Sequence, residues 1–125
     1  MFKNILNLKL PFLVSEIDNK IIGFAYLNKF REKSGYRYSY EDSIYIDNNF
    51  IGMGIGNMLL KELIKFSEIN KNIKTIIAVI GNYKSEPSIN IHKKNGFNIV
   101  GKLDKIGFKN NQWLDAIFMQ KILDD

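Results

Sequence analysis

The chain has 125 residues, a formal charge of +5 at pH 7 and no cysteine, and 46% of its residues are hydrophobic. This composition is that of an ordinary globular domain, and a chain of this size buries about two-thirds of the surface that its unfolded form exposes. The absence of cysteine excludes disulfides, thiolate zinc sites, iron–sulfur clusters and a cysteine nucleophile. The single histidine, His92, excludes a histidine-rich metal centre, so we expect no metal cofactor.

The charge and the lack of long apolar runs limit the kinds of partner and the cellular location that we expect. A sequence pI of about 9.3 indicates an anionic partner without identifying it. No run approaches the roughly 18 apolar residues of a membrane helix, and the N-terminus lacks the pattern of a signal peptide. No linker or repeat divides the sequence. We therefore expect one domain over residues 1–125, located in the cytoplasm and not attached to a membrane.

The first half of the chain predicts strands. Residues 12–17 and 21–26 are rich in β-forming side chains and are separated by the turn-forming residues 18–20, which predicts an antiparallel hairpin. Residues 36–40 alternate aromatic and polar side chains, and residues 42–46 continue in the same style. These two segments together predict one long, bent strand.

From Gly56 the hydrophobic period changes. Leu59, Leu60, Leu63 and Ile64 recur at helical spacing, which predicts an amphipathic helix of about three turns. Residues 75–80 are apolar without alternation, as in a strand that is covered on both faces and paired in parallel. Strand, glycine turn, helix and buried strand therefore predict a βαβ unit with a right-handed crossover.

The last third predicts a short helix and two closing strands. Ser88 is a candidate N-cap for a helix that runs through Asn95, with Gly96 at the position that follows the C-cap. Residues 97–103 and 114–122 predict two strands around a turn at residues 109–112. The expected order is a β-hairpin, β, α, β, α, β, β, which is an α/β (α+β) fold.

The glycine turn at residues 51–56 lies between a strand and a helix. Glycines there allow successive backbone N–H groups to point at one anion, assisted by the helix N-terminus. The turn lacks the acidic residue of a dinucleotide-binding fingerprint, and Asn57-Met58 follows where a phosphate-binding P-loop has Lys-Ser/Thr. A tight turn without a ligand remains the alternative interpretation.

Ordered motifs from residue 11 to residue 123 resemble the GNAT N-acetyltransferases, and most of all their phosphinothricin/methionine sulfoximine acetyltransferase branch. The resemblance implies a mixed, mostly antiparallel sheet with a central βαβ unit and flanking helices, and acetyl-CoA as co-substrate. It is carried by Gly54-x-Gly56, Ala78-Val-Ile-Gly81, Pro87-Ser88, His92-Lys-Lys-Asn-Gly-Phe97, Gly107-Phe-Lys109, Trp113-x-Asp115 and Met119-Gln120.

Two departures from the family pattern bear on function. Ile51 stands where the family's glycine loop begins with a polar or basic residue. Residues 1–10 resemble only the end of the family's second helix, so the usual N-terminal strand and helix are expected to be missing. Residues 12–17 would then form an unpaired sheet edge, and we expect a second chain to cover it in a homodimer.

The resemblance also implies catalytic residues. Glu41 stands where the branch has its general base, and Asp42, on the opposite face of the strand, is the lesser candidate. His92 stands where many family members have a tyrosine that protonates the coenzyme thiolate, and its near-neutral pKa suits that transfer. The alternatives are a solvated charge for Glu41 and a packed side chain for His92.

Binding residues follow from the same resemblance. Backbone amides of the glycine turn would bind the coenzyme pyrophosphate, the strand after Glu41 would line pantetheine and supply an oxyanion donor, and a basic loop would bind the acceptor. Ser88 is expected to be a helix cap first and a cofactor contact second. The expected coenzyme residues are Ile44, Tyr45, Ile46, Met53, Gly54, Ile55, Gly56 and Ser88, and the expected acceptor residues are Arg31, Lys33 and Tyr36.

The leading hypothesis is an N-acetyltransferase that transfers acetyl from acetyl-CoA to the amine of a small amino-acid-like acceptor. The amine would attack the thioester directly in a ternary complex, because no cysteine is available for an acyl-enzyme. The alternative is a catalytically weak or inert acyl-CoA-binding remnant of such an enzyme. A nucleic-acid-binding module is supported only by the high pI, so we expect no nucleic-acid partner.

Overall fold

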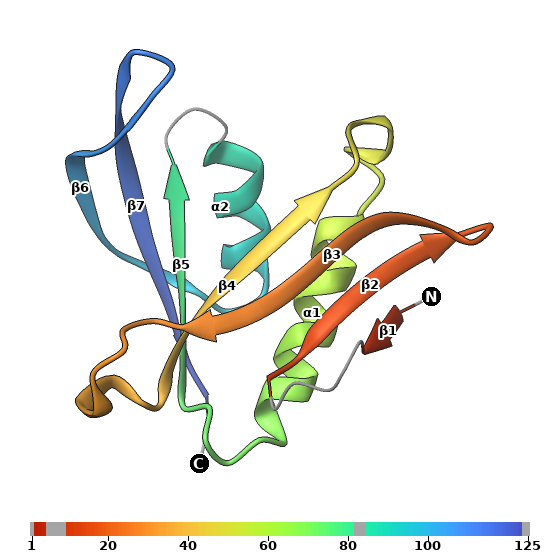
Figure 1. The fold of residues 1–125 in the computed structure, drawn as a ribbon, viewed down its shortest axis with the longest axis horizontal. Helices are drawn as coiled ribbons and strands as arrows, with labels where there is room; N and C mark the ends of the chain where they lie inside the picture. Colours follow the sequence, from red (N-terminus) through yellow and green to blue (C-terminus); the bar gives the residue numbers. More distant parts are fainter. Residues whose placement is uncertain (1, 5–9, 82–84, 124–125) are drawn as a thin grey trace.

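The computed structural model describes residues 2–4, 10–81 and 85–123. These form one seven-stranded sheet with the strand order β1-β2-β3-β4-β5-β7-β6. Two helices, α1 (Ile55–Glu68) and α2 (Ser85–Lys94), lie against the same face of this sheet (Figure 1). Asn95 Nδ2, just beyond α2, donates a hydrogen bond of 2.8 Å to Asn57 Oδ1 on α1, so the two helices are in contact. The expected order of elements is confirmed, with one extra strand at the start.

The predicted hairpin consists of β2 (Phe12–Ile17) and β3 (Lys20–Lys29), which pair antiparallel. Asp18 and Asn19 have positive φ angles of 52° and 67°. Two consecutive residues of this kind form the turn whose twist matches that of a β-hairpin, and Asp and Asn adopt it at low cost. The hairpin prediction is therefore confirmed.

The sheet begins with β1 (Phe2–Asn4), which pairs antiparallel with β2. The expectation that residues 12–17 form an unpaired edge is wrong, because β1 supplies a neighbour for β2. The expected helical end over residues 1–10 is also wrong for residues 2–4, which form a strand, and for Leu10, which is not helical, while residues 1 and 5–9 lie outside the described residues. In the described sheet, the outer strands are β1 and β6.

The expected long strand over residues 36–46 is only partly correct. A 3₁₀ turn at Ser34–Tyr36 interrupts it, and β4 (Ser39–Ile46) begins at Ser39. The backbone N–H of Tyr36 donates to Lys33 O, and that of Arg37 donates to Ser34 O. Ser34 and Gly35 favour such a turn over an extended chain. A second 3₁₀ turn, Asn48–Phe50, follows β4.

Helix α1 is amphipathic, as predicted, and is slightly longer, at 14 residues. Leu59, Leu60 and Leu63 are fully buried. They pack against the helix-covered face of the sheet, because leucines at this spacing form one apolar stripe that leaves water when it lies on a sheet. The buried sheet residues of this core include Leu13, Ala25, Leu27, Tyr40, Ile76, Ala78 and Met119.

Strand β5 (Thr75–Gly81) pairs in parallel with β4 and antiparallel with β7 (Gln112–Ile122). The parallel pairing is as predicted, but the expectation that β5 is covered on both faces is wrong. Ala78 and Ile80 are buried, whereas Val79 on the other face is 38% exposed. The reason is that α1 and α2 lie on the same face, and no described helix covers the opposite one.

Helix α2 begins at Ser85, so Ser88 lies inside the helix and the prediction of Ser88 as its N-cap is wrong. The helix starts earlier because Pro87 is tolerated in a first turn, where its missing N–H needs no partner. Its end is as predicted: Gly96 has a φ of 92°, and the Phe97 N–H donates to His92 O at 2.9 Å.

The two closing strands, β6 (Asn98–Lys109) and β7, form the expected antiparallel pair. Their turn, Asn110 and Asn111, again has two positive φ angles, of 52° and 59°. Strand β6 is longer than predicted and its register shifts between Leu103 and Gly107. It is the outer strand on this side of the described sheet, and most of its side chains are exposed.

Candidate active site

Strands β4 and β5 diverge near the centre of the sheet. They pair over three positions only, which join Ser39–Glu41 of β4 to residues 75–77 of β5, and then separate (Figure 1). A cleft of about 330 Å³ opens where the pairing stops, and α2 forms part of its wall. Its lining residues are Glu41, Asp42, Ser43, Ile44, Tyr45, Val79, Ile80, Gly81, Ser88 and His92.

Glu41 lies at the point of divergence, as the last residue of β4 that pairs with β5. It is opposite Asn28 on β3 and Ile77 on β5. Partial burial raises the pKa of Glu41 above its ordinary value, the negative charge of Asp42 raises it further, and the positive charge of Arg31 lowers it in part. A carboxylate with a raised pKa is a stronger base than an ordinary one, which suits proton abstraction from an amine.

Asp42 points to the other face of β4, toward the helices, because successive strand residues face opposite sides. Its Oδ2 atom lies 2.8 Å from Nε2 of His92 on α2. The other ring nitrogen of His92, Nδ1, lies 2.7 Å from the backbone oxygen of Ser88. Asp42 is 8% exposed and His92 is 4% exposed, so this is a buried pair.

The contacts define the protonation state of His92. A carbonyl oxygen only accepts hydrogen bonds, so Nδ1 is the donor to Ser88. With an ionised Asp42, Nε2 must also donate, which makes the ring a cation. Burial lowers the pKa of His92, but the hydrogen bond to Asp42, the charge of Asp42 and the Ser88 carbonyl together outweigh burial and raise the pKa above its ordinary value.

The His92 ring is also fixed by an aromatic neighbour. The ring of Phe97 lies 4.8 Å from it at 89°, in an edge-to-face arrangement. Ser88, which was expected to contact the coenzyme, lines the cleft and holds His92 through its backbone carbonyl. The structure therefore brings Glu41, Asp42, Ser88 and His92 together at one cleft.

The glycine turn lies between the end of β4 and the start of α1. Gly52 and Gly54 have φ angles of 85° and 81°, values that only glycine adopts without strain. Gly54 is the N-cap of α1, and its carbonyl accepts the N–H of Met58 at 3.1 Å. The side chains of Ile51 and Met53 are 62% and 61% exposed, so this turn presents backbone with few polar side chains.

The remaining coenzyme candidates divide between the cleft and the core. Ile44 and Tyr45 line the cleft, whereas Ile46 packs against the core. Ile55 is buried at the start of α1, and a methyl group on Gly56 would lie 3.4 Å from Ile91 of α2. Such a methyl group would make an ordinary van der Waals contact, so Gly56 lies beside α2.

The acceptor candidates lie on the connection between β3 and β4. The Arg31 side chain donates to the Phe30 carbonyl at 2.8 Å and stacks over the Phe30 ring at 4.0 Å. The positive charge of Arg31 lowers the pKa of Glu41, so Arg31 acts on the site through its charge. Lys33 and Tyr36 are exposed on the same connection. None of the three side chains, Arg31 included, is among the described residues that line the cleft.

Sequence reasoning gave Asp42 too little weight and did not single out Asn28. A usable signal for Asp42 was present: it alternates with Tyr40, Ile44 and Ile46, so it is a charge on the apolar face of the strand. A charge in that position needs a buried partner. Asn28 had no such signal, because only the register between β3 and β4 places it opposite Glu41.

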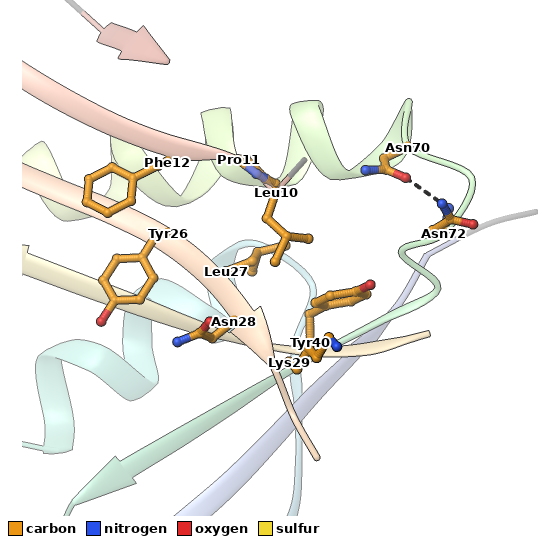
Figure 2. Close-up of a pocket in the computed structure, with 10 residues that line it drawn as sticks. All are labelled: Leu10, Pro11, Phe12, Tyr26, Leu27, Asn28, Lys29, Tyr40, Asn70 and Asn72. Atoms are coloured by element: carbon orange, nitrogen blue, oxygen red, sulfur yellow. Dashed lines mark hydrogen bonds between the residues drawn. The ribbon is translucent and has the colours of Figure 1, made fainter. Parts of the chain in front are cut away.

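A second, larger hollow of about 520 Å³ lies at the ends of β2 and β3 (Figure 2). Figure 2 shows Phe12 and Tyr26 side by side on one side of it, with their rings stacked at 5.1 Å. Lys29 is the only charged residue among the described residues that line it. Volume alone would favour this hollow, but the ionisable groups gather in the smaller cleft, which we take as the candidate active site.

Two negative observations apply to the described part of the chain. No three histidine, cysteine, aspartate or glutamate side chains there lie close enough to share a metal ion. None of its helices has the length and apolar character needed to cross a membrane.

Comparison with known proteins agrees with this geometry. A model of the acetyltransferase (GNAT) domain matches residues 2–118, so the chain belongs to the GNAT acetyltransferase family. It is 39% identical over 119 residues to phosphinothricin N-acetyltransferase of Alcaligenes faecalis, covering 95% of this chain and 60% of that enzyme. It is 33% identical over 115 residues to L-methionine sulfoximine/L-methionine sulfone acetyltransferase of Salmonella typhimurium, covering 92% and 66%.

A solved structure gives the same picture. A GNAT superfamily phosphinothricin acetyltransferase from Sinorhizobium meliloti, in complex with AcCoA, superimposes with a TM-score of 0.83 at 37% identity. The match covers 91% of this chain and 61% of that one. The GNAT-type fold expected from the motifs is therefore confirmed, and the chain spans about 60% of the length of these two phosphinothricin acetyltransferases.

Proposed function

We propose that this chain is an N-acetyltransferase that transfers the acetyl group of acetyl-CoA to the amine of a small amino-acid-like acceptor. The observation that carries the proposal is the position of Glu41, a carboxylate with a raised pKa at the point where β4 and β5 part. The names of the two relatives, which act on phosphinothricin and on methionine sulfoximine or sulfone, support this class of acceptor.

The coenzyme fits the cleft and the turn that follows it. Gly52 and Gly54 curl the backbone at the N-terminus of a 14-residue helix, where amides and the helix dipole favour a pyrophosphate. Pantetheine would run along β4, with Ser88 on the opposite wall. The net charge of +5 favours association with polyanionic coenzyme A. The binding residues proposed are those expected from the sequence, with Ile46 and Ile55 contributing backbone rather than exposed side chains.

The reaction proposed is a direct attack in a ternary complex. The neutral amine forms the new C–N bond at the thioester carbonyl, the C–S bond breaks, and coenzyme A leaves as the thiolate. Glu41 accepts the proton that the amine loses, directly or through one water molecule. A backbone N–H of residues 44–46 stabilises the charge that develops on the carbonyl oxygen.

The acceptor is held by the connection between β3 and β4. Arg31 is the strongest of the three candidates, because its charge already acts on Glu41. A guanidinium there favours an acceptor that carries a carboxylate, through charge-assisted hydrogen bonds. Lys33 and Tyr36 would complete the site from the same connection.

The test is free-thiol release from acetyl-CoA, measured with a thiol-reactive dye and a panel of acceptors led by phosphinothricin and methionine sulfoximine. The protein has no cysteine, so it contributes no background. We expect acceptor-dependent release that is lost in Glu41→Gln and kept in the matched control Glu62→Gln, which alters a partly exposed pair with Lys65 on α1. Stabilisation by acetyl-CoA without turnover of any acceptor would instead identify a coenzyme-binding remnant.

We also propose a homodimer, although the edge of β2 that motivated it is covered by β1. An outer strand, β1 or β6, would then supply the contact. Light scattering over a wide concentration range tests this, and a constant monomer mass would refute it.

A further inference from the structure

Among the described residues of the cleft, the buried Asp42–His92 pair is the one group of ionisable side chains that the proposed reaction does not yet use. Its two members come from different elements, β4 and α2, and meet at 2.8 Å. A buried ion pair is not by itself a stabilising device, because removing both charges from water costs about as much as their attraction returns. Its location therefore needs another reason.

The pair lies where the backbone pairing between β4 and β5, which joins the two halves of the sheet, ends. Glu41 is the last residue of β4 that pairs with β5, and Asp42 is the next residue along β4. From there on, β4 is tied through Asp42 to His92 on α2, the helix that follows β5. The bridge thus fixes the far wall of the cleft relative to β4 at the position adjoining Glu41.

The bridge leaves His92 poorly suited to donate a proton. Both of its ring nitrogens are engaged, one with Ser88 O at 2.7 Å and one with Asp42 at 2.8 Å. The ring is 4% exposed and is held edge-on by Phe97. Transfer of a proton to a coenzyme thiolate would require breaking a buried bond. This geometry is that of a fixed partner for Asp42.

We propose that Asp42 and His92 are a positioning pair for acetyl transfer: their buried bridge holds α2 to β4 across the cleft and fixes the carboxylate of Asp42, the negative end of the pair, beside Glu41. The proposal rests on the acetyltransferase function proposed above, and it replaces the expectation that His92 protonates the thiolate. Neither residue is a catalytic residue in this account, since both act through Glu41 and through the shape of the cleft.

The charge beside Glu41 has a measurable consequence. The charge of Asp42 raises the pKa of Glu41 and that of Arg31 lowers it, whereas His92, the cation bridged to Asp42, is not among the described groups whose charge shifts this pKa. Strand β5 carries no titratable side chain, and the described charged residues of α2 other than His92, namely Glu86, Lys93 and Lys94, are exposed. In Asp42→Asn the positive charge of His92 is lost together with the negative charge of Asp42, but only the charge of Asp42 is a cause of the shift at Glu41. The pKa of Glu41 should therefore still fall, and the acidic limb of kcat/KM should move to lower pH.

Asp42→Asn is a suitable variant because it removes the charge without removing the contact. A neutral His92 keeps its Nδ1–H bond to Ser88, and the new amide can donate to the unprotonated Nε2. We expect a folded enzyme whose acidic limb lies at lower pH, with acetyl-CoA and methionine sulfoximine as substrates. The matched control Asp104→Asn, at an exposed pair with Lys102, should leave the limb in place.

A double-mutant cycle separates positioning from proton donation. His92→Gln lowers kcat by one factor in the wild type and by another in the Asp42→Asn background. If the pair acts as a unit, the first factor should be about 10 times the second. If His92 is an independent proton donor, its removal costs the same factor in both backgrounds, and that result would overturn the proposal. An acidic limb that does not move in Asp42→Asn would overturn it as well.

A spectroscopic measurement tests the pair without turnover. His92 is the only histidine, so the imidazole nitrogen signals of ¹⁵N-labelled protein report this ring alone. We expect a doubly protonated ring at neutral pH in the wild type and a neutral Nδ1–H ring in Asp42→Asn. A neutral ring in the wild type would overturn the proposal. If the wild type acetylates no acceptor, the proposed function fails, and these signals still decide whether the charged pair exists.

Discussion

The buried bridge between β4 and α2 makes a prediction about stability that compares two substitutions at the same position. Asp42→Ala removes the partner of His92 and leaves a buried ring nitrogen without its hydrogen bond. Asp42→Asn keeps a hydrogen bond, in its neutral form. Because Asp42 is 8% exposed and His92 is 4% exposed, water replaces the lost partner poorly. We therefore expect the two variants to differ strongly.

The magnitude follows from the burial. Breaking a buried pair by removing one partner costs about 3–5 kcal/mol. For a domain of this size, this loss corresponds to a fall in Tm of roughly 10–20 °C. It is also a large share of the total free energy of unfolding, which is about 5–15 kcal/mol for such a domain. Replacing charged by neutral hydrogen bonds in Asp42→Asn should cost about 1 kcal/mol.

The pH dependence has a definite sign. The pKa of His92 is raised in the folded protein, so the stability from its charge is fully present below the unfolded pKa of about 6.5. It is lost as the pH rises through the folded pKa. The pKa of Glu41 is also raised in the folded protein, so its contribution to stability also falls as the pH rises above the ordinary pKa of a glutamate. The measurement is therefore repeated in Glu41→Gln, which removes this contribution.

Urea unfolding followed by circular dichroism at several pH values is the assay, with the m-value checked for constancy. We expect the free energy of unfolding of the wild type to fall above pH ~6.5 and that of Asp42→Asn to stay level there. Equal destabilisation by Asn and Ala, or a level wild-type curve above that pH, would refute the reasoning.

Three further predictions concern the base, the core and the glycine turn. Because the charge of Arg31 lowers the pKa of Glu41, Arg31→Gln should move the acidic limb of kcat/KM to higher pH in a pH–rate profile. An unchanged limb would contradict this electrostatic effect. Leu63→Ala, at a fully buried position of α1, should cost about 2–5 kcal/mol in urea unfolding, while Ile69→Ala, 79% exposed just beyond the helix, should stay within about 0.5 kcal/mol. Gly54→Ala should lower the free energy of unfolding by about 1–2 kcal/mol, because Gly54 has a φ of 81°. It should also weaken acetyl-CoA binding measured by calorimetry, and an unchanged affinity would argue against the turn as the pyrophosphate site.

Local features of the sequence determined most of the elements. The leucine spacing of α1, the Asp18-Asn19 turn and Gly96 after α2 each carry their own structural preference, so they were found where the pattern predicted them. The start of α2 was misjudged because both Ser85 and Ser88 are acceptable near a helix N-terminus, and the choice depends on packing. The interruption at Ser34–Tyr36 was missed because the alternation of aromatic rings outweighed the Ser34-Gly35 turn signal.

The sequence also located the candidate site through motifs, since Glu41, the glycine turn and His92 belong to ordered patterns along the chain. What those residues do to one another was decided by the tertiary structure. The 2.8 Å contact between Asp42 and His92 joins residues 50 positions apart, and no local pattern specifies such a distance. The place where β4 and β5 part depends on sheet register and twist, which arise only when all the strands pair. Local sequence patterns therefore determined the elements and the candidate residues. Long-range packing determined the cleft and the position of the Asp42–His92 pair beside Glu41.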